Sequence, residues 1–98
     1  GDLVIPESVI SIGKGAFSGC RSLASIEIPE SVTSIGEDAF YGCRSLTSIS
    51  IPENVTTIEN HAFENCEKLD IIIDNSKDNV KVGKDAFKDC KSVTWLKD

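Results

Sequence analysis

Four cysteines and one histidine are the side chains of this 98-residue sequence best suited to nucleophilic or metal chemistry. The cysteines recur at steps of 23, 23 and 24 residues, as Cys20, Cys43, Cys66 and Cys90. Cysteines at equivalent positions of adjacent stacked coils point in the same direction, which leaves their Cβ atoms too far apart for a relaxed disulfide. We therefore expect free, buried thiols that pack in a core. No C-x-x-C pair is present, and the sequence predicts no zinc site.

His61 lies at a position that Gly15, Asp38 and Asp85 occupy in the other repeats, and these residue types are typical of exposed turns. Cys66 belongs to the core column, so a Cys–His nucleophilic pair is not expected. The sequence has no glycine-rich phosphate loop, G-x-S-x-G or H-E-x-x-H string. We expect His61 to be an exposed surface residue, and the protein to be no enzyme, with no cofactor and no metal site.

The step of the cysteines is shared by the apolar residues, which form the repeat C-x-x-L-x-x-I-x-I-P-x-x-V-x-x-I-x-x-x-A-F-x-x. A unit this short cannot enclose a core and must pack on its neighbours, which predicts a solenoid. The Ile-x-Ile segments predict parallel strands, ended by Pro6, Pro29 and Pro52. The Ala-Phe segments predict short helical turns, each followed by a residue that tolerates a left-handed backbone: Gly19, Gly42, Asn65 and Asp89.

The fourth repeat departs from the pattern. A polar segment, residues 74–80, replaces the Ile-Pro-Glu turn, and the step lengthens by one residue. We expect a bulged or mobile loop there.

These residues resemble the BspA-like leucine-rich repeats of bacterial and protist surface proteins. The string from Ile28 to Phe63 carries the family pattern almost position for position. The resemblance implies a single leucine-rich-repeat domain over residues 1–98, mainly β and of about four coils, with a parallel sheet of short strands on the concave side and short helical turns on the convex side. It also implies a secreted or cell-surface protein that binds host or neighbouring-cell molecules. We expect the chain to be part of a longer repeat array.

The charge balance excludes several kinds of partner. The formal net charge is −6, and no basic cluster is present, so we expect neither nucleic-acid binding nor attraction to anionic membranes. The longest aliphatic run is residues 71–73, too short for membrane insertion. Glu7, Glu30 and Glu53 follow the prolines and predict a solvated acidic column.

Outward-facing strand residues form the predicted partner-binding site. If the repeat step is constant, small polar residues face outward in the early coils. In the late coils an apolar patch faces outward, and it includes a tryptophan, a residue type common in binding hot spots. The polar positions are Ser25, Glu27, Ser48 and Ser50, and the apolar ones are Ile71, Ile73 and Trp95.

Two hypotheses follow for the function. The first is an adhesin-like, non-enzymatic interaction module that binds a protein or glycan on its concave face. The second is a structural spacer with no ligand, in which the apolar patch only contacts the next coil. The open ends of the stack, at Leu3, Ile5 and Leu96, predict either end-to-end self-association or marginal stability of the chain.

Overall fold

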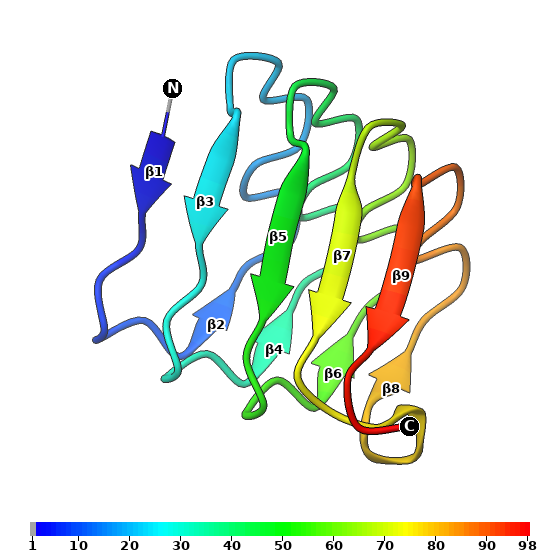
Figure 1. Ribbon diagram of the computed structural model, residues 1–98. Coiled ribbons are helices and arrows are strands. Elements are labelled where there is room, and N and C mark those ends of the chain that lie inside the picture. Colours follow the sequence, from blue (N-terminus) through cyan, green and yellow to red (C-terminus); the bar gives the residue numbers. More distant parts are fainter. Residues whose placement is uncertain (1) are drawn as a thin grey trace.

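Each repeat contributes two short strands to the solenoid seen in the computed structural model, which describes residues 2–98 (Figure 1). The first row of strands lies side by side: β1 (Asp2–Val4), β3 (Ser25–Glu27), β5 (Ser48–Ile51), β7 (Asp70–Ile73) and β9 (Ser92–Trp95). The second row consists of β2 (Ser11–Ile12), β4 (Ser34–Ile35), β6 (Thr57–Ile58) and β8 (Lys81–Val82). All pairs are parallel, and the mainly-β solenoid of about four turns confirms the predicted fold class.

The two rows differ in how they are hydrogen-bonded. The second row is one continuous sheet, in the order β2-β4-β6-β8. The first row is hydrogen-bonded in two sections, β1-β3 and β5-β7-β9. β3 and β5 lie side by side at the junction of these sections (Figure 1).

A stack of phenylalanines forms the centre of the core. The rings of Phe17, Phe40, Phe63 and Phe87 are stacked at centroid distances of 5.3, 5.0 and 6.2 Å. The two middle rings are fully buried and the two outer rings are partly exposed. Core packing is therefore complete in the middle coils and incomplete at both ends, where the inward-facing Leu3 is 36% and Val82 is 39% exposed.

The turn side of the coil differs from the helical turns that the sequence predicts. The Ala-Phe segments are successive tight turns, closed by bonds such as Ala39 N–H to the Gly36 carbonyl (3.1 Å) and Cys43 N–H to the Phe40 carbonyl (3.2 Å). Among residues 2–98 the one helix is a 3-10 turn, Lys77–Asn79. The prediction of helical turns was wrong, because two residues of each repeat adopt a left-handed backbone where the sequence predicted one. The second left-handed residue interrupts the helix.

The predicted left-handed residues are confirmed at Gly19, Gly42, Asn65 and Asp89. A second left-handed residue occurs four positions earlier in each coil, at Gly15, Asp38, His61 and Asp85. Residues of both sets donate their N–H groups to the next coil, as Asp38 does to the Asn60 carbonyl (3.1 Å) and Gly42 to that of Glu64 (2.8 Å). The turn side is therefore tied together by backbone hydrogen bonds without being a sheet.

The proline turns behave as expected up to the third coil. The N–H groups of Val9, Val32 and Val55 each donate to the proline carbonyl three residues earlier, at 3.1 Å. In the fourth coil the buried Asn75 organises the polar loop instead. Its side chain donates to the Glu53 carbonyl (3.1 Å) and accepts from the Ser76 N–H (2.8 Å) and the Asn79 amide (3.0 Å). The loop is thus tied to the preceding coil by this side chain.

The cysteine column is a ladder of free thiols, as the sequence predicts. The Sγ atoms of Cys43, Cys66 and Cys90 donate to phenylalanine carbonyls of the preceding coil at 3.0–3.1 Å. Cys43 and Cys66 are fully buried, whereas Cys20 and Cys90 are partly exposed. Hydrogen bonding to Cys66 and burial raise the pKa of the Cys43 thiol, and burial raises that of Cys90 to about 11.

Replacing the central ring of the stack should be costly. We expect Phe40→Ala to lower the free energy of unfolding by about 3–5 kcal/mol, because a fully buried ring leaves a cavity between two others. The exposed neighbour Tyr41 is the control, and Tyr41→Ala should cost less than about 1 kcal/mol. Urea unfolding followed by circular dichroism measures both, and Phe40→Leu serves if the alanine variant does not fold. Equal costs for both positions would contradict the buried stack.

The raised thiol pKa of Cys90 predicts a loss of stability in alkali. The folded thiol keeps its proton up to about pH 11, whereas the unfolded thiol loses it near pH 9.0. The protonated Cys90 thiol therefore makes its full contribution to the free energy of unfolding below pH 9.0. This contribution is lost as the pH rises to about 11, which lowers the free energy of unfolding by about 1–2 kcal/mol. Urea midpoints across this range should fall less steeply in Cys90→Ala than in the parent chain. Parallel pH profiles for the two proteins would refute the assignment.

Candidate binding face

The exposed side chains of β1, β3, β5, β7 and β9 form what we call the strand face. Ser25, Glu27, Ser48 and Ser50 are exposed on it, which confirms the outward orientation predicted for these four residues. Between them Ile26, Ile49 and Ile51 point into the core. The alternation follows from the two-residue period of a strand, which sends neighbouring side chains to opposite faces.

The predicted exposure of Ile71 and Ile73 is wrong, because both are fully buried while Ile72 is 38% exposed. The pairing of β5 with β7 places Ile71 beside Ile49 and Ile73 beside Ile51, both inward positions. The cause is a coil that is one residue shorter at this point. Asp70 follows Leu69 directly, whereas Thr47 separates Leu46 from Ser48. A shift of one residue in a strand moves every side chain to the other face.

Trp95 likewise does not lie on the strand face. It pairs with Ile73 in the inward column and is half-buried, and its ring meets that of Phe87 edge to face at 6.4 Å. The predicted apolar surface patch of Ile71, Ile73 and Trp95 therefore does not exist. One signal in the sequence marks the true register, namely the polar residue at the head of each strand: Ser25, Ser48, Asp70 and Ser92.

A groove on the strand face crosses β1, β3 and β5, over the junction between the two hydrogen-bonded sections. Its volume is about 490 Å³, and Ser25, Glu27, Ser48 and Ser50 all line it. Glu7 and Glu30 of the acidic column lie at its edge, so three carboxylates line the groove and no Lys, Arg or His does. The groove thus offers hydroxyl groups and negative charge.

A second groove, of about 310 Å³, continues from the first toward the C-terminal coil. Ser50 and Glu30 line both, and the apolar side chains of Ile72 and Leu96 line the second alone. Neither of these two residues belongs to the predicted site. Their exposure follows from the shortened coil, which places Ile72 beside Ser50 in the outward column.

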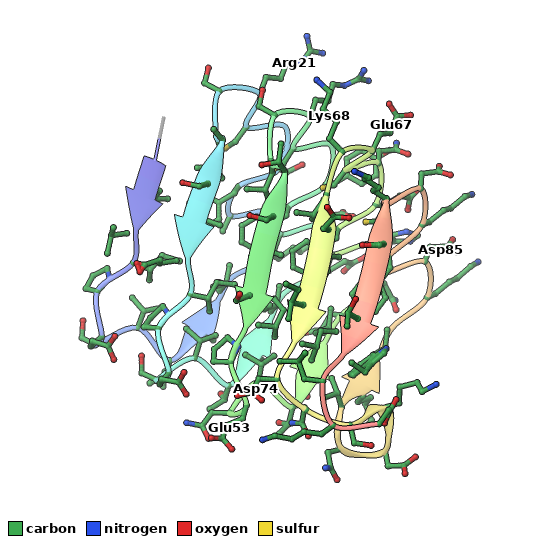
Figure 2. The ribbon with its side chains drawn as sticks, viewed as in Figure 1. Arg21, Glu53, Glu67, Lys68, Asp74 and Asp85 are labelled. Carbon is green, nitrogen blue, oxygen red and sulfur yellow. The ribbon has the colours of Figure 1, made fainter. Side chains whose placement is uncertain are left out.

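A group of charged side chains includes Asp74, which lines this second groove. Glu53 and Asp74 lie together at the end of the strands, opposite the end that carries Arg21, Glu67 and Lys68 (Figure 2). The Lys97 ammonium bridges them, at 3.6 Å from Glu53 and 3.4 Å from Asp74. A hydrogen bond from Lys97 to Asp74 and the charge of that carboxylate raise the pKa of Lys97.

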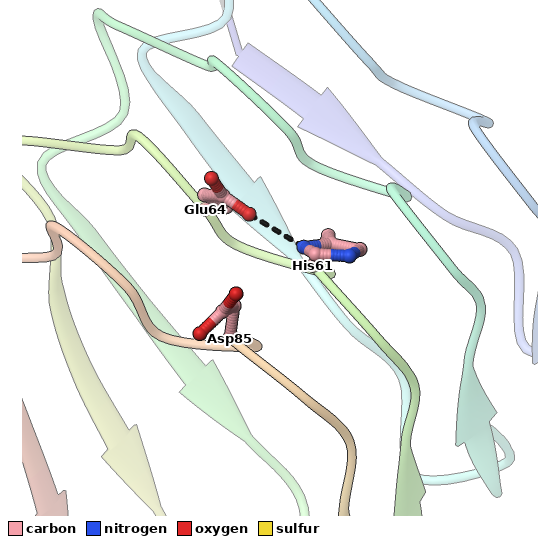
Figure 3. A group of neighbouring side chains, drawn as sticks. All are labelled: His61, Glu64 and Asp85. Atoms are coloured by element: carbon pink, nitrogen blue, oxygen red, sulfur yellow. Dashed lines mark hydrogen bonds and ion pairs between the residues drawn. The ribbon is translucent and has the colours of Figure 1, made fainter.

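On the turn side, the structure brings together one group of side chains that sequence reasoning left apart. His61 is not fully exposed as expected but half-buried, with Nδ1 2.5 Å from an Oε atom of Glu64 (Figure 3). Asp85 of the next coil lies beside them. Among residues 2–98 this is the one cluster whose geometry suits a metal ion.

The described chain also contains no helix with the length and apolarity needed to cross a bilayer.

The register of β7 can be tested with two adjacent isoleucines. Ile73→Ser should lower the free energy of unfolding by about 3–5 kcal/mol, since it places a hydroxyl in the core and leaves a cavity. Ile72→Ser is the matched control and should cost less than about 1 kcal/mol because its side chain already meets water. Urea unfolding measures both variants. If Ile72→Ser lowered the free energy of unfolding more than Ile73→Ser does, the result would instead support the outward orientation of Ile73 that a constant 23-residue step predicts.

Comparison with known proteins agrees with this architecture. The family model of the BspA-type leucine-rich repeat region matches residues 1–97 in six copies. The chain is also similar to the crystal structure of a leucine-rich cell surface protein from Faecalibacterium prausnitzii A2-165, at 33% identity and a TM-score of 0.81. The match covers 100% of this chain but only 26% of that protein. No curated protein matches the sequence significantly. The chain belongs to the BspA-type leucine-rich repeat family.

Proposed function

We propose that the chain is a non-enzymatic interaction module of a secreted or cell-surface, adhesin-like protein. It binds a protein or glycan of a host or neighbouring cell through the groove on the strand face. Membership of the BspA-type family and the similarity to a cell surface protein support the location. The groove across β1, β3 and β5 is the observation that supports binding there.

The lining of the groove indicates the chemistry of the partner. Serine hydroxyls both donate and accept hydrogen bonds, and they suit sugar hydroxyls or polar protein groups. The carboxylates of Glu7, Glu27 and Glu30 favour a partner that presents basic groups or hydrogen-bond donors. With Ile71, Ile73 and Trp95 outside the face, exposed apolar contact comes from Val4 in the first groove and from Ile72 and Leu96 in the second.

The thiols support a non-enzymatic role. Nucleophilic cysteines need an accessible thiolate, which neighbouring cations or helix ends stabilise. Here hydrogen bonding to Cys66 and burial raise the pKa of Cys43, and burial raises the pKa of Cys90. A hydrogen bond with Cys43 lowers the pKa of Cys66, but that thiol is fully buried and so has no access to a substrate. His61 contacts Glu64 on the turn side instead of a cysteine.

The spacer remains the second candidate function, because the exposed serines of β3 and β5 are small repeat residues without an apolar anchor. We also retain end-to-end self-association as a proposal. The inward-facing Leu3 stays 36% exposed at one end of the stack, and the inward-facing Val82 stays 39% exposed at the other. Burying such surfaces between copies would be favourable.

A matched pair of serine substitutions tests the binding face. Ser50 lines both grooves, so Ser50→Arg should obstruct them and reverse part of their charge. The labelled parent chain is applied to arrays of glycans and of purified extracellular-matrix and host-surface proteins. We expect each bound partner to lose at least about 10-fold in affinity with Ser50→Arg. Ser18→Arg, an identical change at an exposed turn-side residue, should leave binding unchanged.

Salt and concentration distinguish the remaining outcomes. Binding that involves the groove carboxylates should weaken as the ionic strength rises. A chain that binds nothing on either array, or a partner that is indifferent to Ser50→Arg, would favour the spacer. Light scattering as a function of protein concentration separately tests self-association, which a monomer at millimolar concentration would contradict.

A further inference from the structure

We propose that His61, Glu64 and Asp85 form a site for a divalent transition metal of the zinc type, bound between two adjacent coils on the turn side. One potential ligand atom of each residue lies within 4.8 Å of the other two. The three side chains converge from two neighbouring turns (Figure 3). Neither the proposed strand-face function nor the family membership requires this site.

The backbone holds the two halves of the site in fixed relative positions. His61 and Asp85 occupy the same register of successive coils, and both have a left-handed backbone, with φ of 61° and 56°. The His61 N–H donates to the Lys84 carbonyl at 2.9 Å, and the Phe63 N–H donates to that of Ala86 at 2.8 Å. These bonds flank the site on both coils, so little ordering of the chain is needed when a metal binds.

Burial sets the accessibility of the ligands. The Glu64 side chain is 15% exposed and that of His61 is 33% exposed, so water has only partial access to the pair. The Asp85 side chain is also half-buried. An ion can therefore enter from solvent and still lose most of its competing water at the protein ligands.

The charges of the cluster are unbalanced without a cation. Two carboxylates lie beside one imidazole, and the imidazole contacts only the carboxylate of Glu64. The Asp85 carboxylate makes no ion pair or side-chain hydrogen bond within residues 2–98, although lysines flank it in the sequence at positions 84 and 88. A divalent cation would interact favourably with both carboxylates, at the position where the structure otherwise places like charges together.

The donor set selects the class of metal. Imidazole nitrogen with two carboxylate oxygens is a set that Zn²⁺ accepts, whereas Ca²⁺ and Mg²⁺ prefer six or more oxygen ligands. Three protein ligands leave a fourth tetrahedral position for water or for a group from a partner.

The site is confined to one pair of coils. At the equivalent positions one coil earlier stand Asp38, Tyr41 and His61, so that a tyrosine replaces the glutamate. The first pair offers Gly15, Ser18 and Asp38. The repeat therefore supplies its own matched controls, with nearly the same backbone and a different ligand set.

Titration of the untagged chain with Zn²⁺ tests the proposal, by calorimetry and by the visible spectrum of a Co²⁺ complex. We expect one ion per chain. His61→Gly, the residue at the equivalent Gly15, and Asp85→Asn both tolerate the left-handed backbone and should each weaken binding at least about 10-fold. Asp38→Asn, at the same register one coil earlier, should bind like the parent. Saturating Zn²⁺ should raise the melting temperature of the parent by on the order of 10 °C.

Other results would overturn the site. Zn²⁺ bound with equal affinity by the parent and His61→Gly would place the ion elsewhere on the chain. A Co²⁺ spectrum with sulfur charge-transfer bands would place it at a thiol, such as the partly exposed Cys20 or Cys90. The absence of binding would make the cluster a plain His61–Glu64 contact. Equal affinity for Ca²⁺ and Zn²⁺ would indicate an unselective acidic surface. Circular dichroism of each variant confirms that the fold is retained.

Discussion

Backbone hydrogen bonds between coils on the turn side place the strongest constraint on which residues this solenoid can use. Residues at two positions of each repeat donate an N–H to the next coil from a left-handed backbone, as Asp38 does to Asn60 (3.1 Å) and Asn65 to Lys88 (2.9 Å). Glycine adopts this conformation without cost, and Asn, Asp and His adopt it more readily than other residues. The phenylalanine between the two positions also donates to the next coil, which aligns its ring with the stack. Backbone geometry thus specifies the turn composition and, through it, the core.

The same constraint explains how the side chains of the proposed metal site come together on the turn side. A left-handed position excludes most apolar and β-branched residues, so it is filled mainly by glycine or by small polar residues, and the polar ones are also potential ligands. Stacking repeats such residues in register, one coil apart, as it does His61 and Asp85. Glu64 then completes a set of three at the coil where Tyr41 stands one repeat before. In the proposed site, a structural requirement of the repeat therefore supplies two of the three ligands.

Periodicity alone predicts the fold, the free thiols and one left-handed position per coil, since each depends on residue types at a fixed step. It fails where the step changes. Three consecutive isoleucines, residues 71–73, are equally apolar, so hydrophobicity cannot decide which of them faces inward. Only the polar Asp70, paired with Ser48, fixes the register. Periodicity does not predict the cluster of His61, Glu64 and Asp85 for another reason. Its members lie in two different coils, and Glu64 belongs to no metal-binding motif in the sequence.

The corrected register also changes how the proposed binding face would act. With Ile71, Ile73 and Trp95 assigned to the core, the face presents serines and carboxylates, and its exposed apolar side chains are few, namely Val4, Ile72 and Leu96. Hydrogen bonds exchanged with water contribute only about 0.5–1.5 kcal/mol each, so a groove of this kind gives selectivity more readily than high affinity. Repetition compensates for this weakness, because neighbouring sites on one surface raise the effective concentration of a multivalent partner. A polar face on a repeated scaffold is therefore better suited to binding extended or clustered partners than to holding a single small ligand tightly.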